Sequence, residues 1–377
     1  MTNEEKLSFI KDAHKLTMKY RLWDAPQKAF AELKALDDEH WSIFSAKLLP
    51  KMPKAFYRYR PFNNYSVDEL RNEYAWFSLP AEFDDGTDST LNLDIEEEVE
   101  ELSAHPETAI IPLSKAIISQ QYKRITGLKP DDEMIEEAIR LWPEGKLDIT
   151  AAKTALTKYC PGQSSDTLIK MIEHFNKTPL EDSISKPLKG LVEFYMSLNQ
   201  RLRSGLFCLC LAESYSNDVM WAKYAGERTG FCIEYDIPAK SLIGQKTLMA
   251  TNPIYYGEKK PMHLLNILID GLSADDEDKI NGWTKKMYED INVSSLTKSS
   301  DWSFQKEWRV SFAPEAGGNR QRFPFVKAIY IGDRMSPENR RTIFEIAKSH
   351  GWNIYERKMN KTSSKVVYQQ VKRVING

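Results

Sequence analysis

The chain has 377 residues, 41% of them hydrophobic and 11% aromatic, which predicts two domains, or one domain with a large insertion, around a buried core. The formal net charge of -2 gives no reason to expect nucleic acid or a membrane as a partner. Four cysteines without CxxC spacing and six histidines argue against a structural zinc site, so we expect no metal.

The sequence predicts neither a membrane-spanning segment nor a secretory signal. No run of about 18 apolar residues is present, which argues against a transmembrane helix. The first residues, 1–15, are charged and lack the apolar stretch of a secretory signal. We therefore expect a cytoplasmic protein that does not bind membranes.

The first part of the chain predicts helices. Apolar residues in 3–50 recur at a helical period, and Thr2 and Glu5 have the spacing of a capping box. Pro53 closes this region, so 1–53 is expected to form an N-terminal helical region.

Strand character begins after Pro53. Residues 55–60 alternate as in a strand, and 76–78 predict a second short strand. Between them, Ser66 stands three residues before Glu69 and is expected to cap a short helix that runs through Glu73.

A long helical pattern separates these strands from the rest. Residues 94–204 are mostly polar with helical stripes, and the acids of 94–101 indicate a solvated helix face. Further strands are predicted at 206–211, 230–235, 252–256, 307–312 and 327–331, with helices at 219–224 and 261–295.

The end of the chain predicts one more helix. Ser336 is a cap residue, Pro337 occupies the first helical position and Gly351 follows the end. We expect 353–355 to be the last strand. Residues 357–377 contain no acid, so we interpret them as a basic tail that is solvated or contacts phosphate.

Together these elements predict a β core of six to eight short strands, split by helices. The strands do not alternate regularly with helices, and GxGxxG and GxxxxGK[ST] are missing, which argues against a Rossmann domain and a P-loop. The expected regions are N-terminal helices at 1–53, a β-rich core at 54–92 and 205–356, a helical insertion at 93–204 and the tail at 357–377.

Four blocks of distinctive residues follow one another along the chain. They are Tyr-Arg-Tyr-Arg at 57–60, Trp-Phe-Ser-Leu-Pro at 76–80 with Phe83, the segments 208–214 and 220–235, and a last block of Lys298, Trp302 and Glu-Trp-Arg at 307–309. In this order they resemble a large bacterial family of unknown function that is common in mobile and defence-associated gene neighbourhoods. The family's Asn-Asp-Pro loop is replaced here by Asp-Asp-Gly at 84–86, so a role of that asparagine does not carry over.

The core of that family is similar to the ADP-ribosyltransferase fold. The resemblance implies a split mixed or antiparallel β core, and with the N-terminal helices and the large helical insertion, which lie outside the matching blocks, we expect an α+β fold. It also implies a toxin-type or antiviral-defence effector that consumes NAD as a substrate, with a key residue on an early strand and a glutamate on a late one. We expect a macromolecular acceptor, protein or nucleic acid, and a regulatory partner protein.

Cleavage of the nicotinamide bond of NAD needs a group that holds phosphate, an aromatic clamp and a carboxylate that stabilises an oxocarbenium-like state. We assign these catalytic roles to Arg58, Tyr224 and Glu307 respectively. Each has an alternative. Arg58 could form a surface salt bridge on an edge strand, and Glu307 could pair with Arg309. The residues assigned to cofactor binding are Tyr57, Tyr59, Ser78, Trp221 and Arg309. Ordinary core packing is the alternative for Trp221.

Two other functions stay open. A metal-dependent effector nuclease could use Lys306 and the carboxylates of Asp84, Asp85, Glu234, Asp236 and Glu307. A non-enzymatic protein could sense a ligand or a phage protein through its aromatic core. Metal dependence of the activity would favour the nuclease, and consumption of NAD would favour the transferase.

Overall fold

The structure is a computed structural model with a mixed α+β fold. Besides a few single positions, it describes residues 1–18, 38–93, 180–274, 277–312, 319–360 and 365–371. The chain divides into two compact units. The first comprises Met1–Thr90, Gln200–Lys259 and Asn292–Gly377, and the second comprises Leu91–Asn199 and Lys260–Ile291.

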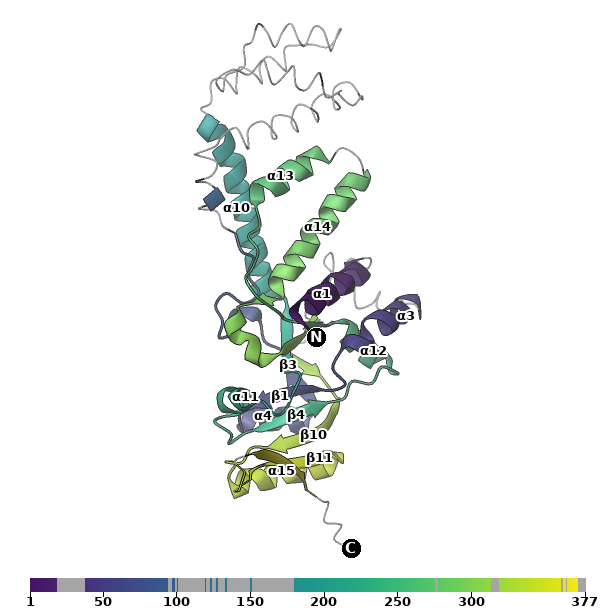
Figure 1. Ribbon diagram of the computed structural model, residues 1–377, viewed down its shortest axis with the longest axis vertical. Helices are drawn as coiled ribbons and strands as arrows, with labels where there is room; N and C mark the ends of the chain where they lie inside the picture. Colours follow the sequence, from purple (N-terminus) through teal and green to yellow (C-terminus); the bar gives the residue numbers. More distant parts are fainter. Residues whose placement is uncertain are drawn as a thin grey trace. The chain divides into compact units, whose positions relative to one another are not determined.

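The first unit is built on a large mixed sheet. Within the described residues this sheet has eight strands, and Figure 1 shows β4, β10 and β11 among them side by side. In sheet order they are β12 (Val366–Gln370), β11 (Asn353–Met359), β10 (Val326–Ile331), β4 (Phe231–Tyr235), β1 (Phe56–Arg60), β3 (Phe207–Ala212), β8 (Glu307–Phe312) and β5 (Thr251–Pro253). The neighbours β10 and β11 are parallel and the other pairs are antiparallel.

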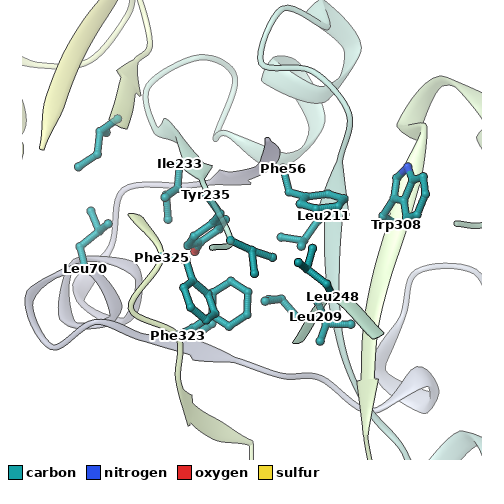
Figure 2. Packing of buried hydrophobic residues seen from close by; sticks show 14 of the residues in the cluster. Phe56, Leu70, Leu209, Leu211, Ile233, Tyr235, Leu248, Trp308, Phe323 and Phe325 are labelled. Atoms are coloured by element: carbon teal, nitrogen blue, oxygen red, sulfur yellow. The ribbon is translucent and has the colours of Figure 1, made fainter. Parts of the chain in front are cut away.

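Alternation along the strands gives the two faces of the sheet different characters. One face carries the main hydrophobic core, whose members include Phe56, Leu211, Ile233 and Trp308. Figure 2 shows these side chains converging from neighbouring strands. The opposite face carries Tyr57, Tyr59 and Tyr330 together with polar groups. The candidate site develops from this second face.

Two short sheets complete the strands of the first unit. They pair β2 (Tyr74–Trp76) with β9 (Arg320–Arg322), and β6 (Tyr255–Tyr256) with β7 (Thr297–Lys298).

The first and the last of the described helices begin where the sequence predicts them. The capping box at the N-terminus forms, because the Glu5 N–H donates to Thr2 Oγ1 at 3.1 Å and the Thr2 nitrogen donates to Glu5 Oε2 at 2.7 Å. Ser336 caps α15, and Gly351 ends it with a φ of 76°, a left-handed conformation that favours glycine. The helices of this unit are α1 (Asn3–Met18), α3 (Asp38–Lys47), α4 (Asn64–Arg71), α11 (Asp218–Tyr224), α12 (Leu242–Met249) and α15 (Pro337–His350), with 3-10 helices η2 (Leu49–Lys51), η3 (Pro80–Glu82) and η5 (Ser300–Gln305). Among the described helices, each is too short or too polar to cross a bilayer.

The cap of α4 corrects the expectation for Ser66. Asn63 is the N-cap, since its side chain accepts from the Ser66 N–H at 2.9 Å, and Ser66 Oγ in turn accepts from the Asn63 N–H at 3.1 Å. Ser66 is therefore the third helical residue. Its hydroxyl also donates to the Pro61 carbonyl at 2.6 Å, which joins the helix to the end of β1.

The N-terminal helices belong to the first unit and are not a separate region. The ring of Phe9 meets that of Trp308 edge to face, with centroids 5.4 Å apart. The Asn3 side chain donates to the Tyr256 carbonyl at 2.7 Å. The expected boundary at residue 53 therefore does not separate two compact bodies.

The described part of the expected basic tail, mainly residues 357–360 and 365–371, forms strands instead of a tail, and residues 372–377 lie outside the described residues. Strand β11 continues to Met359, and β12 pairs with it at the sheet edge. Arg357 is almost fully buried, and its charge is compensated by ion pairs with Asp218, at 2.7 Å, and with Asp333. Both acids are distant from Arg357 in sequence, so local pattern could not predict these ion pairs.

The second unit combines the expected helical insertion with a later segment. Residues 260–291 join it, which the predicted insertion of 93–204 did not include. Met262 N–H donates to the Asn92 carbonyl at 2.8 Å, and Leu264 N–H donates to Glu98 Oε2 at 3.2 Å. The described helices that contribute are α10 (Leu180–Gly205), α13 (Leu264–Ser273) and α14 (Glu277–Ser295). Of the acids predicted on a solvated face at 94–101, the structure describes three: Glu97 and Glu100 are exposed, whereas Glu98 is buried, and the other acids lie outside the described residues.

Candidate functional site

A hollow opens where the main sheet is split between β1 and β3. All five residues of β1 pair with β4, whereas the register between β1 and β3 records one pair, Tyr57 with Ala212. Beyond that pair the strands diverge around a cavity of about 380 Å³. We call this cavity the hollow. Its lining comprises Tyr57, Arg58, Tyr59, Arg60, Trp76, Ser78, Glu82, Phe83, Asp84, Asp85, Cys208, Cys210, Leu211, Ala212, Met220, Tyr224, Lys298, Trp302, Gln305 and Glu307.

The segment after β2 closes one end of the split. Ser78 and Cys208 exchange two backbone hydrogen bonds of 2.9 and 2.8 Å, so this segment replaces β1 as the neighbour of β3. Two side chains fix the backbone of Trp76 in the same segment. Its N–H donates to Glu69 Oε1 at 2.9 Å, and its carbonyl accepts from Arg58 Nη2 at 2.9 Å. The hollow is therefore framed by paired backbone at both ends.

Glu307 begins β8 and lies in the same cross-strand row as Tyr57. The register joins Tyr57 to Ala212 and Ala212 to Glu307, which places the three side chains on one face. Lys306 just before it has a left-handed φ of 43°, and the Glu307 N–H donates to the Tyr256 hydroxyl at 2.8 Å. These constraints fix where the carboxylate enters the hollow, although Glu307 is only 4% exposed.

Two cations hold the Glu307 carboxylate. Arg309 Nε donates to Oε1 at 2.6 Å, and Lys298 Nζ lies 3.4 Å from Oε2. The ion pair with Arg309, considered as the alternative to a functional role, is thus present. Glu307 nevertheless lines the hollow, so it is both paired and at the cavity wall.

Asp88 completes a buried network with these three residues. Its two oxygens accept from Arg309 Nη1 at 2.8 Å and Nη2 at 2.7 Å, a bidentate geometry. Lys298 lies 3.0 Å from Asp88 Oδ2, and Ser89 Oγ accepts from Arg309 at 2.9 Å. The two negative and two positive side chains thereby neutralise one another in a region with little solvent. Such pairing is what keeps the free-energy cost of burying charged groups moderate.

The network keeps Glu307 ionised. Burial by itself would raise the pKa of the Glu307 carboxyl, but the charges of Arg309 and Lys298 outweigh it and hold the pKa below its ordinary value. The pKa of Asp88 is lowered for the same reason, with Arg309 as the main counter-charge to burial. Burial would lower the pKa of Lys298, yet Glu307 and Asp88 raise it above its ordinary value. The site therefore holds a carboxylate, which suits stabilisation of positive charge better than proton donation.

An amide links the carboxylate network to the aromatic wall. Gln305 Oε1 accepts from Lys298 at 3.0 Å, and Gln305 Nε2 donates to the Tyr224 hydroxyl at 2.6 Å. Burial, followed by the charge of Asp84, raises the pKa of Tyr224, so its hydroxyl stays protonated. Tyr224 and Trp302 then present their rings to the hollow.

Arg58 reaches the hollow in a different way from the one expected. Its strand is internal, not an edge, and alternation places Arg58 on the face opposite Glu307. Because β1 and β3 diverge, both side chains still line the hollow. The Arg58 guanidinium is engaged, since Nη1 lies 3.4 Å from Glu69 and Nη2 donates to Trp76. Arg60 Nε also lies 3.0 Å from Glu69, as expected from its position on the same face.

The predicted cofactor-binding residues fall into two groups. Tyr57, Tyr59 and Ser78 line the hollow. In contrast, Trp221 and Arg309 are not among the described residues that line the hollow, and both are almost fully buried. Trp221 Nε1 donates to the Tyr215 carbonyl at 2.7 Å, which corresponds to the core-packing alternative.

Arg309 acts on the hollow through its ion pairs with Glu307 and Asp88. Sequence reasoning did not assign roles to Asp88, Lys298, Gln305 and Trp302. For Lys298 and Trp302 the motif that ends in Glu-Trp-Arg was a usable signal. No comparable signal marked Asp88, because its partner Arg309 is distant in sequence.

The carboxylates considered for a nuclease are divided between two places. Asp84, Asp85 and Glu307 line the hollow. Glu234 and Asp236 instead pair with Lys327, at 3.4 and 3.3 Å. In the described part of the chain, no group of three or more His, Cys, Asp and Glu side chains has the arrangement of a metal site.

Comparison with known proteins gives one match. A family described as "Protein of unknown function (DUF2971)" matches residues 220–310. This segment runs from α11 into β8 and includes Tyr224, Lys298, Trp302 and Glu307. No curated protein and no solved structure matches the chain. The matched segment thus contributes one wall of the hollow, and β1 and the 76–85 segment lie outside it.

Proposed function

We propose that the chain binds NAD in the hollow and transfers ADP-ribose to a macromolecule, as an effector of bacterial defence or a toxin. The observation that carries this proposal is an ionised carboxylate, that of Glu307, at one hollow with the rings of Tyr224 and Tyr57 in a split sheet. The regulatory partner protein and the identity of the acceptor belong to the same proposal.

The chemistry asks for what these groups supply. The bond between the ribose C1′ and the nicotinamide nitrogen breaks, and nicotinamide leaves as a neutral base with the electron pair. The acceptor's nucleophile then forms a bond to C1′ and loses its proton. Positive charge develops on the ribose ring in between, and a fixed carboxylate in a site with little water stabilises it strongly.

Each predicted residue has a role that its position supports. Glu307 faces the developing charge, and Tyr224 contributes a flat ring for nicotinamide. Arg58 contributes positive charge near the diphosphate, although Glu69 partly neutralises it. Tyr57, Tyr59 and Ser78 are placed to contact the rest of the cofactor. Trp221 and Arg309 are buried and support the site without lining the hollow.

A matched pair of glutamates tests the proposal. Purified protein is incubated with NAD labelled in the nicotinamide and with cell extract, and the released nicotinamide is measured. We expect Glu307→Gln to lower the rate by at least about 100-fold, the effect of removing one strong electrostatic stabiliser. Glu234→Gln should keep the rate within about twofold. Glu234 lies in the same cross-strand row and is also buried, but it contacts Tyr330 and Lys327 instead of the hollow.

A second substitution separates catalysis from folding. Glu307→Gln removes a charge between Arg309 and Lys298 and so destabilises the fold. Glu307→Asp keeps that charge and shortens the side chain, so circular dichroism and melting should remain close to wild type while the rate falls. Unchanged nicotinamide release by a folded Glu307→Asp and Glu307→Gln pair would refute the transferase. Nucleic acid cleavage that stops on chelation of Mg²⁺ would instead support the nuclease. A retained biological effect of Glu307→Gln would support a binding protein.

A further inference from the structure

The ring of Trp302 at the hollow is approached by two lysines. Lys223 Nζ lies 4.2 Å from its centroid and Lys298 Nζ lies 4.8 Å from it. The same Lys223 ammonium lies 5.5 Å from the centroid of the Tyr224 ring. Both rings line the hollow. Distances below about 6 Å between a cation and a ring centroid are those of a cation–π interaction.

The two lysines differ in how firmly they are held. Lys298 is almost fully buried and is fixed by Asp88, Glu307 and Gln305. Lys223 has a side chain that is 36% exposed, and its ion pair with Asp84 spans 3.4 Å to a carboxylate that is 61% exposed. An exposed pair of this kind contributes little free energy and breaks readily. Lys223 can therefore leave the two rings at small cost, whereas Lys298 cannot.

We propose that Trp302 and Tyr224 form a subsite for a planar organic cation, and that Lys223 occupies it when no ligand is bound. A cationic ring that replaces the ammonium regains the attraction of both π faces. It also gains the negative charge of Asp84 once Lys223 has moved away. The carboxylates of Asp85 and Glu307 also line the hollow and add to this preference.

Under the proposed function, on which this reading of the ligand rests, the cation is the pyridinium of oxidised NAD. The reduced cofactor carries a neutral dihydropyridine, so the subsite selects the oxidised form. Cleavage then turns the pyridinium into neutral nicotinamide, which no longer benefits from the two rings and Asp84. The same interaction that selects the substrate therefore favours release of the product.

Two small probes test the subsite without any turnover. Binding of 1-methylnicotinamide, a cation, and nicotinamide, its neutral counterpart, is measured by calorimetry and by quenching of tryptophan fluorescence. We expect the cation to bind about five- to thirtyfold more tightly, the range of one partly desolvated cation–π contact. Equal affinities for the two probes would overturn the proposal.

Substitutions at the subsite give the second arm. Lys223→Gln removes the competing ammonium and should strengthen binding of the cation about three- to tenfold. Trp302→Leu should abolish the preference between the probes, and Trp302→Phe, which keeps a ring, should restore part of it. Lys327→Gln is the matched control, since Lys327 is also an exposed lysine paired with carboxylates and lies away from the hollow. Weaker cation binding by Lys223→Gln would contradict the competition between the two cations.

The outcomes separate this inference from the proposed function. A preference for the cation without any nicotinamide release would leave the subsite standing and remove the transferase. Nicotinamide release without a preference between the probes would do the opposite. Circular dichroism of each variant shows whether the fold is retained.

Discussion

Glu307 and Glu234 occupy the same row of one sheet and illustrate two uses of a buried carboxylate. The row runs from Glu307 through Ala212 and Tyr57 to Glu234, so the side chains share a face. Glu234 lies between β1 and β10, both of which pair with β4, with a register shift of β10 beside it. Its carboxylate accepts from the hydroxyl of Tyr330 at 2.6 Å, and the ring of Tyr330 stacks on those of Tyr215 and Tyr355. Glu307 lies beyond the split, where its carboxylate meets a cavity. The difference teaches that the gap in the sheet, and not the residue type, decides which of the two glutamates lines a cavity.

The largest effect should come from breaking the charge network beside the split. Arg309→Met leaves Asp88 and Glu307 with Lys298 as the remaining cation of the network, which should cost about 3–5 kcal/mol of unfolding free energy. On the continuous side, Lys327→Met removes a lysine that is 49% exposed and should change it by less than about 1 kcal/mol. Urea unfolding followed by circular dichroism measures both. Equal costs would mean that the two sides do not differ.

Acid should destabilise the split side through the same network. The folded pKa values of Asp88 and Glu307 lie below their ordinary values of 3.8 and 4.5. The unfolded chain therefore binds protons first as the pH falls. The contribution is complete above about pH 5 and is lost progressively below it, by up to about 1.4 kcal/mol per pH unit for each proton bound. Asp88→Asn should flatten this decline in urea midpoints measured between pH 7 and pH 3. An unchanged slope would show that Asp88 does not contribute to the acid sensitivity.

Glycine-to-alanine substitutions compare how tightly the closed part of the sheet and the border of the hollow are packed. A Cβ at Gly230 would lie 2.2 Å from the Arg60 carbonyl oxygen, at the closed junction of β1 and β4. Gly230→Ala should therefore destabilise the protein by about 1–3 kcal/mol, the cost of overpacking. Gly86, in the segment that borders the hollow, has nothing within 4 Å of such a Cβ, so Gly86→Ala should stay within about 0.5 kcal/mol. Thermal melting compares the two, and a costly Gly86→Ala would mean that the loop is packed as tightly as the sheet.

The smallest effect on stability is expected at Ser78. Its backbone is paired with Cys208, so Ser78→Ala preserves the closure of the split and should change stability by less than about 0.5 kcal/mol. If the hydroxyl contacts NAD, affinity should fall by up to about tenfold, the value of one hydrogen bond. Calorimetry with NAD measures this. Full affinity in the variant would remove Ser78 from the site.

Local sequence signals predicted several helices and strands, but not which strands lie next to one another in the sheet. The cap at Ser336 and the glycine at Gly351 predicted the limits of α15 correctly, alternation identified β1, and β8 was predicted at 307–312. The alternation of Arg58 and Arg60 also placed both on one face correctly. Which strands would flank β3 depends on long-range pairing, so neither the internal position of β1 nor the split could be derived from the residues alone.

The same limit applies to the site. Glu307 could be chosen because a carboxylate at the start of an apolar strand requires a partner or a cavity, and it has both. Asp88 was not predicted, since its loop has no recognisable motif and its partner Arg309 is far away in sequence. Arg357 was interpreted as part of a charged tail for the same reason. Charged residues were thus located by local pattern, whereas their pairing is a property of the fold.

The exchange of hydrogen bonds between Ser78 and Cys208 has a consequence for recognition. Peptide groups of alternate residues in an antiparallel strand point the same way, so the Cys210 peptide points to the side where Cys208 meets Ser78 and Ala212 meets Tyr57. The hollow thereby borders a stretch of main chain inside the sheet, and a bound molecule can pair with it as a missing strand would. Such contacts survive every side-chain substitution, so a residual affinity common to all variants would identify them.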